Sequence, residues 1–232
     1  FHFPRTPNDV SKARQRLSFD ELFCYLFPRR YRHCMTKQDS TPIMMPPSNP
    51  LIAKYLVQLP YQLTGAQQRV WKNIQLDVQS LKTVFRLIQG DVGSGKTDIA
   101  ILSMLIAVGA GYKSVMIVPT EILAEQHYLK CQLRLSKMGV DVLLLKGKQK
   151  KVERQRVLDA LTGEKPLIVI GTHALIQKHV EIEKCGFIVV DEQHRFGVFQ
   201  RQALLSKSTE GQPHCIFMTA TPIPRTLMLT HT

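Results

Sequence analysis

Short apolar runs alternate with longer amphipathic stretches over most of this chain. Six apolar runs of four or five residues predict β-strands, at residues 84–88, 114–118, 142–145, 167–170, 187–190 and 215–218. Between them, the spacing of the apolar positions predicts helices at residues 97–108, 121–136 and 151–161. Runs that are apolar throughout are typical of strands covered on both faces of a sheet. The alternation therefore predicts an α/β fold with a mostly parallel sheet flanked by helices, which binds ligands at the carboxyl ends of its strands.

The segment before residue 60 has a different texture. Residues 10–27 show apolar positions at helical spacing with basic residues between them. Residues 35–50 are rich in proline and turn-forming residues, which indicates an exposed linker or an irregular strap. We therefore expect a short helical and irregular N-terminal segment at residues 1–59, followed by the main domain at residues 60–232.

Composition and charge narrow the class of protein. The chain is 44% hydrophobic, as is common for soluble globular proteins, and its longest apolar run, residues 99–111, is too short for a bilayer span. The net charge of +13 favours a phosphate-rich partner such as nucleic acid, the alternative being a merely basic surface. The five cysteines form no C-x-x-C pair, which favours buried reduced thiols over a metal site. The chain starts with Phe1 rather than Met, so we expect it to be a piece of a longer polypeptide.

A glycine-rich loop joins the first predicted strand to the first predicted helix. Its sequence, Gly90-Asp91-Val92-Gly93-Ser94-Gly95-Lys96-Thr97, fits the phosphate-binding pattern G-x-x-x-x-G-K-[ST] in the strand–loop–helix context that this pattern requires. Glycines let backbone N–H groups point inward, and the helix N-terminus favours an anion. We expect Lys96 to reach the β- and γ-phosphates of a nucleotide and the Thr97 hydroxyl to hold Mg²⁺. The alternative is a glycine-rich turn that matches the pattern by chance.

A pair of acids follows the strand predicted at residues 187–190. Asp191 would help to hold Mg²⁺, and Glu192 would orient or deprotonate the attacking water. Gln193 and His194 come next, and we expect both to hydrogen-bond near the γ-phosphate. His194 is a candidate catalytic residue, and Gln193 is a candidate for coupling loss of the γ-phosphate to movement. The alternative for the acidic pair is a cap of the next helix. The alternative for Gln193 and His194 is that their side chains are hydrogen-bonded within a loop and have no role in catalysis.

Two hydroxyl residues follow the last predicted strand. Thr219 and Thr221 can hydrogen-bond both to the acidic pair and to a neighbouring domain, so we expect them to couple the two. A plain turn with threonine caps is the alternative.

Together these residues resemble the superfamily 2 helicases, and within them the RecG family of DNA helicases. The similar stretches extend along nearly the whole chain: residues 59–67 resemble the Q-type motif, 86–97 motif I, 119–127 motif Ia, 171–175 motif Ib, 191–198 motif II with its extension and 218–226 motif III. Residues 1–4 and 16–22 resemble the segment that follows the wedge domain of this family. The transcription–repair coupling translocases share some of these elements, but Phe usually replaces Ser94 and Glu replaces Gln193 there. Lys146-Gly147, where the family more often has Thr-Gly, is a departure near a DNA contact.

The resemblance implies a RecA-like lobe that uses ATP and Mg²⁺, with Gln67 contacting adenine. It also implies contacts to the DNA backbone, which set position and not sequence, from Pro119, Thr120 and Glu121 in one loop and from Gly171, Thr172 and His173 in another. The implied partners are branched DNA, namely forks and Holliday junctions, and a second helicase lobe of the same polypeptide. A monomeric bacterial protein of the cytoplasm, associated with the nucleoid and not with a membrane, is expected.

The resemblance places a wedge domain before Phe1 and a second lobe with an arginine finger after Thr232. We therefore expect residues 1–232 by themselves to bind ATP weakly and to hydrolyse it poorly. Two alternatives stay open. The chain can be a nucleic-acid or protein docking module without catalysis, or part of an RNA-directed superfamily 2 helicase.

Overall fold

The structure, a computed structural model, describes residues 6, 8, 10–12, 14–20, 42–80, 83–177, 179–192 and 211–220. The chain divides into two compact units, of which Thr41–Pro222 is the larger and Phe1–Ser40 with Ile223–Thr232 the smaller. In the smaller unit the described residues from 8 to 20 are helical apart from the gaps between them, which confirms the first part of the helix predicted at residues 10–27. Residues 21–27 lie outside the described residues.

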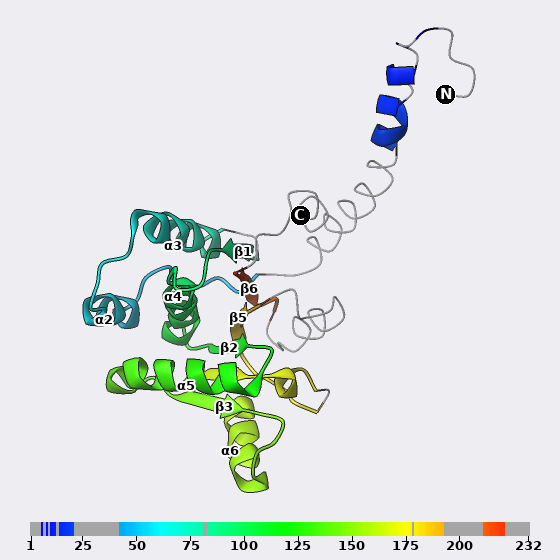
Figure 1. Cartoon of the computed structure of the whole chain (residues 1–232). Helices are drawn as coiled ribbons and strands as arrows, with labels where there is room; N and C mark the ends of the chain where they lie inside the picture. The colour runs from blue at the N-terminus through cyan, green and yellow to red at the C-terminus, as the bar shows by residue number, and fades with distance from the viewer. Residues whose placement is uncertain are drawn as a thin grey trace. The chain divides into compact units, whose positions relative to one another are not determined.

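The larger unit is built on one six-stranded sheet in which every pair of neighbouring strands is parallel. The strands are β1 (Phe85–Gln89), β2 (Lys113–Ile117), β3 (Val142–Leu145), β4 (Ile168–Gly171), β5 (Cys185–Val190) and β6 (His214–Thr219). Their order in space is β1-β6-β5-β2-β4-β3 (Figure 1). The α/β prediction is confirmed, and the predicted strand bounds differ from the observed ones by at most two residues.

Five α-helices surround the sheet in the described part of this unit. They are α2 (Pro50–Gln58), α3 (Gly65–Val78), α4 (Lys96–Gly109), α5 (Glu121–Leu135) and α6 (Lys151–Thr162), with short 3₁₀ turns at Ser136–Met138 and His173–Ile176. The last three α-helices were predicted, whereas α2 and α3 were not. Both carry local start signals. Asn49 accepts hydrogen bonds from two backbone amides of α2, and Pro50 occupies its first turn, where proline is tolerated.

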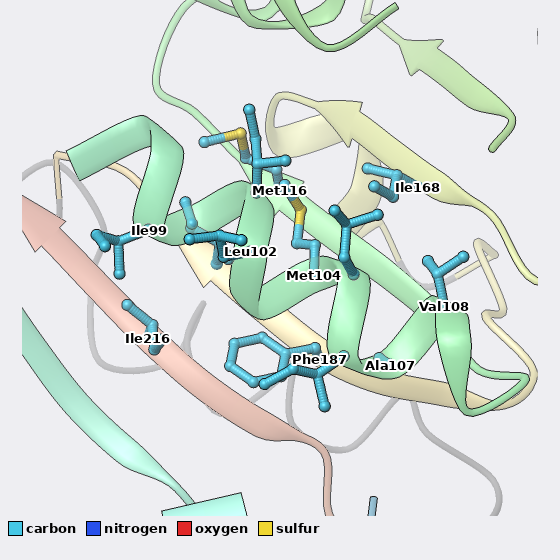
Figure 2. Packing of buried hydrophobic residues seen from close by; sticks show 14 of the residues in the cluster. Ile99, Leu102, Met104, Ala107, Val108, Met116, Ile168, Phe187 and Ile216 are labelled. Carbon is cyan, nitrogen blue, oxygen red and sulfur yellow. The ribbon is translucent and has the colours of Figure 1, made fainter. Parts of the chain in front are cut away.

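The core has two layers because successive strand residues point to opposite faces of the sheet. In β2, Met116 joins the layer under α2–α5, whereas Val115 and Ile117 join the layer under α6. Figure 2 shows the first layer, where Leu102 and Met104 of α4 lie near Phe187 of β5. Three of the five cysteines, Cys131, Cys185 and Cys215, are described, and all three are buried and unbridged.

Residues ahead of α3 also pack on this core. The side-chain amide of Asn49 donates to the carbonyl of Leu105 in α4, at 2.9 Å. Ile52 and Tyr55 of α2 are 4% and 1% exposed and belong to the layer under α2–α5. The boundary at residue 59 stays a prediction, and the larger compact unit begins at Thr41. Among the helices of the described residues, none is long and apolar enough to cross a membrane.

Candidate nucleotide and nucleic-acid site

The glycine-rich loop at residues 90–95 lies between the carboxyl end of β1 and the start of α4. Gly93 and Gly95 have φ of 83° and 80°, in the left-handed region that glycine adopts without a Cβ penalty. Gly95 is also the N-cap of α4, and no side chain caps the helix there. The amide of Asp98 donates to the Gly95 carbonyl at 3.0 Å, and those of Lys96 and Thr97, which no side chain caps, can bind an anion, as the helix dipole also favours.

The side chain of Lys96 folds back over this loop. Its ammonium group donates to the carbonyls of Gly90 and Asp91, the second at 2.7 Å. A Cβ atom on Gly90 would lie 2.7 Å from Oγ of Ser94, so a larger residue at this position would require the Ser94 side chain to move. The Lys96 cation is therefore held against the loop, which is the place that the phosphate-binding pattern gives to its lysine.

Gln67 contacts the loop directly. With Thr64 it forms a capping box at the start of α3, in which its Oε1 accepts from the Thr64 amide at 2.8 Å. Its Nε2 donates to the carbonyl of Ser94, also at 2.8 Å. A Cβ atom on Gly95 would overlap Nε2 of Gln67. The structure thus places Gln67 against the glycine-rich loop, and its contact with adenine stays a prediction.

The acidic pair lies at the same end of the sheet as the glycine-rich loop, namely at the carboxyl ends of the strands. Asp191 follows β5, and Oδ1 of Asp191 accepts from the amide of Glu192 at 3.0 Å. Glu192 has a φ of 54°, an uncommon conformation for a residue with a side chain. Thr219 is the last residue of β6, the strand between β1 and β5, and it is 1% exposed. Its carbonyl accepts a hydrogen bond from the Gly90 amide at 3.3 Å. Gln193, His194 and Thr221 lie outside the described residues.

The oxygen donors of this edge fit a magnesium ion. The hydroxyl of Thr97 and the carboxylate of Asp191 are ligands that Mg²⁺ prefers. β1 and β5 are two strand spacings apart, about 10 Å, with Thr219 between them. A nucleotide phosphate chain held by the loop can span this separation, so the residues present fit a nucleotide with its ion.

The two loops predicted to contact DNA are neighbours, because β2 pairs with β4. The backbone amide of Val118 donates to the Gly171 carbonyl at 3.0 Å. The hydroxyl of Thr120 caps α5 by accepting from the Leu123 amide at 3.3 Å. Pro119 beside it is half-buried, and this loop leads straight into α5.

In the second loop, Gly171 and Thr172 are buried and His173 is exposed. A Cβ atom on Gly171 would overlap the carbonyl oxygen of Leu145 and lie 2.7 Å from Cδ1 of Leu175, which explains the glycine by packing. The contacts of all these residues with DNA stay predictions.

A basic loop, residues 146–150, follows β3, the outermost strand on the side of the sheet away from β1. The ammonium group of Lys146 pairs with Glu125 of α5, and the amide of Lys148 donates to Oε1 of Glu121 at 3.2 Å. The carboxylate of Glu121 therefore positions the basic loop. Two further cations, Lys150 and Lys151, are exposed, and no carboxylate of the described residues forms an ion pair with them or with Lys148.

Two polar contacts of the site were not predicted. The buried carboxylate of Asp98, directly after Thr97, accepts from Tyr55 at 2.9 Å and from Tyr61 at 2.6 Å, and it pairs with Arg134 of α5. Burial by itself raises the pKa of Asp98, but the hydrogen bonds from Tyr61 and Tyr55 and the positive charges of Lys130 and Arg134 outweigh it, so that this pKa is lowered. An acid inside an otherwise apolar predicted helix was the signal available in the sequence.

The second unpredicted contact joins His127 of α5 to Asp191. Nε2 of His127 lies 3.1 Å from Oδ2 of Asp191, and the two side chains are 13% and 14% exposed. His127 lies on the same face of α5 as the buried residues Ala124, Cys131 and Leu135. Helical spacing therefore indicated that His127 faces inward, but not which residue it meets.

Comparisons with known proteins agree with this geometry. A family model described as DEAD/DEAH box helicase matches residues 64–230. The chain is 45% identical to an ATP-dependent DNA helicase RecG of Synechocystis sp. over 230 residues, which cover 99% of this chain and 27% of that relative. It is 42% identical to the protein of the same name from Aquifex aeolicus, over 93% of this chain and 27% of that one. The chain thus spans roughly a quarter of the length of these relatives.

Solved structures give the same result for the fold. A structure of RecG bound to a three-way DNA junction superposes with a TM-score of 0.84 and 37% identity, over 98% of this chain and 30% of that one. A structure of Mss116p bound to single-stranded RNA and AMP-PNP superposes with a TM-score of 0.61 and 17% identity, over 80% of this chain and 41% of that one. The second similarity concerns the fold alone.

Proposed function

We propose that this chain, which belongs to the DEAD/DEAH box helicase family, is the ATP-binding lobe of a DNA motor that remodels branched DNA such as stalled forks and Holliday junctions. One observation supports this most directly. The glycine-rich loop, Thr219 and the acidic pair lie at the carboxyl ends of three neighbouring parallel strands, where sheets of this kind bind their ligands. The names of the two RecG relatives and of the RecG structure point to the same activity.

In the proposed reaction each residue of the site has one task. The amides at the start of α4 and the ammonium group of Lys96 bind the β- and γ-phosphates, while Gln67 holds the loop from outside and contacts adenine. Thr97 and Asp191 would hold Mg²⁺, which neutralises charge on the phosphates when it is bound. Glu192 accepts a proton from the attacking water, and His194 and Gln193 lie next to it in the chain.

The nucleic-acid partner would lie at the carboxyl ends of the other three strands, β2, β4 and β3. The loops at residues 119–121 and 171–173 are adjacent, and the exposed cations Lys148, Lys150 and Lys151 follow the next strand. Cations and backbone amides bind phosphates without regard to base sequence, so this arrangement suits a motor that moves along a duplex. Thr219 and Thr221 would transmit the state of the nucleotide to the rest of the motor.

Nucleotide binding tests the first half of the proposal. We expect Lys96→Ala to lower the affinity for a fluorescent ATP analogue about 10-fold or more, because a charge-assisted hydrogen bond to phosphate contributes roughly 1.5–3 kcal/mol. Lys72→Ala, on the exposed side of α3, is the matched control and should bind as the parent does. Unchanged affinity in Lys96→Ala would count against a nucleotide site in this loop.

The partner is tested by ATPase stimulation in the natural protein that contains these residues. Forked DNA should raise ATP turnover more than duplex RNA does, and turnover should fall with salt as phosphate contacts weaken. Stimulation by RNA alone would favour an RNA-directed motor. Nucleic-acid affinity that ignores ATP, without turnover, would favour a docking module.

A further inference from the structure

Among the described residues, His127 provides a side-chain hydrogen bond to the carboxylate of Asp191. Its Nε2–H donates to Oδ2 of Asp191 at 3.1 Å, while Oδ1 is held by the amide of Glu192 at 3.0 Å. The amide of Asp191 itself donates to the carbonyl of Ile117 in β2, at 2.8 Å. One oxygen of the predicted magnesium ligand is thus oriented by its own chain segment, and the other by a helix from elsewhere in the fold.

That helix begins in a loop predicted to contact DNA. α5 starts at Glu121, directly after Pro119 and Thr120, and Thr120 caps it. His127 lies six residues further along, about 9 Å at the rise of an α-helix. Since a hydrogen-bonded helix moves as a stiff unit, a displacement of this loop shifts His127 relative to the sheet.

The surroundings of the pair make its alignment sensitive to such a shift. Both side chains are only about one-seventh exposed, so little water is available to replace the contact when it lengthens. Asp191 is fixed to the sheet by its backbone, whereas the position of His127 follows α5. A small movement of the helix therefore changes how one carboxylate oxygen is held.

We propose that His127 is a positioning residue that couples the loop at residues 119–121 to Asp191. Nucleic acid at this loop and a magnesium nucleotide beside Asp191 then change each other's affinity through the contact between His127 and Asp191. The inference rests on the proposed function and adds to it the residue that links its two ligands. Coupling between binding sites is reciprocal, so either ligand can be used to measure it.

The test measures the affinity for a fluorescent, non-hydrolysable ATP analogue with Mg²⁺, in the presence and absence of saturating forked DNA, in the natural protein that contains these residues. The ratio of the two dissociation constants is the coupling. For the parent protein we expect a ratio of about 5 or more, the lower end of common couplings. His127→Ala and His127→Phe should bring the ratio close to 1, and the phenylalanine variant retains an aromatic ring without a donor. His127→Gln places an amide donor where Nε2 lies, and should retain most of the coupling.

Two controls separate positioning from damage to the fold. Gln132→Ala changes an exposed residue of the same helix and should leave the ratio at the parent value. Binding of the analogue in EDTA reports on the phosphate loop alone, and it should be the same in every variant. A merely structural role of His127 would lower this binding too, and would not be rescued by glutamine.

The possible outcomes are distinct. If the parent protein binds no nucleotide, or no DNA, the proposed function fails. If both ligands bind and the parent ratio is 1, or if His127→Ala and His127→Phe keep the parent ratio, the coupling role of His127 is wrong and the proposed function stands.

Discussion

Replacing Asp98 with alanine removes a buried carboxylate that joins four segments of the fold. Asp98 is 1% exposed in the first turn of α4 and binds Tyr55 of α2, Tyr61 of the following loop and Arg134 of α5. Because α4 begins directly after the glycine-rich loop, this cluster also fixes the start of the helix that follows that loop. We expect Asp98→Ala to destabilise the larger unit without changing its fold.

The loss of free energy of unfolding depends on which interactions Tyr55 and Arg134 retain without the carboxylate. The hydroxyl of Tyr55, which is 1% exposed, retains Arg134 as a donor but loses its acceptor, at a cost of about 1–3 kcal/mol. Arg134 loses its counter-charge, but 24% of its side chain is exposed, so water offsets part of that loss. The low end of the roughly 3–5 kcal/mol for a broken buried pair therefore applies. We expect a total loss of about 3 kcal/mol, out of the roughly 5–15 kcal/mol of a typical domain.

Urea unfolding followed by the fluorescence of Trp71, the single tryptophan, measures this loss. With a slope of roughly 1–3 kcal/mol per molar urea, the midpoint should fall by about 1–3 M. Asp141→Ala is the matched control, since Asp141 pairs with Lys165 on the surface with side chains 51% and 68% exposed, and it should cost less than about 1 kcal/mol. If Asp98→Ala unfolds at the same urea concentration as Asp141→Ala, the reasoning on the buried cluster is wrong.

Acid provides a second measure of the same cluster. The pKa of Asp98 is lowered below its ordinary value of 3.8, so the folded state binds a proton less readily than the unfolded state. The stability that the parent has over Asp98→Ala should therefore be complete above about pH 4–5, and should decline as the pH falls below 3.8 through the lower pKa of the folded state. An advantage of the parent that is independent of pH would contradict this.

Three further predictions concern single contacts. Burial lowers the pKa of His214 below 6.5, although a hydrogen bond to a backbone carbonyl partly opposes it, so the free energy of unfolding should fall as the pH drops below about 6.5. His214→Gln should flatten that slope in urea titrations at pH 7.5 and 5.5, and equal slopes would count against the buried neutral ring. Gly171→Ala should cost about 1–3 kcal/mol by thermal unfolding, because the added methyl group meets a backbone carbonyl of β3, and no loss would mean that the strands can separate there. Thr120→Ala should cost about 1 kcal/mol as a lost N-cap while Thr120→Ser restores it, and a DNA-binding defect without loss of stability would instead place the hydroxyl on the nucleic acid.

The predicted elements were found where the local signal was strong. The strand bounds at residues 142–145 match the observed ones, because four apolar residues in a row between polar stretches fit a strand buried on both faces. α2 and α3 were missed although Asn49-Pro50 and the Thr64 and Gln67 pair are helix start signals. The prolines before α2 favoured an exposed linker or an irregular strap. Only the packing of Ile52 and Tyr55 on the core made α2 part of the larger unit.

The sequence by itself determined the glycine-rich loop, the acidic pair and the parallel sheet that carries them. These features depend on spacing within one segment, such as glycines that permit positive φ and apolar runs that need cover on both faces. The tertiary structure decided which distant side chains meet: Asp98 with Tyr55, and His127 with Asp191. Periodicity indicates that a side chain points inward, but a contact over 43 or 64 residues depends on how helices lie against the sheet. That arrangement follows from the packing of the whole core, so only the folded chain specifies these partners.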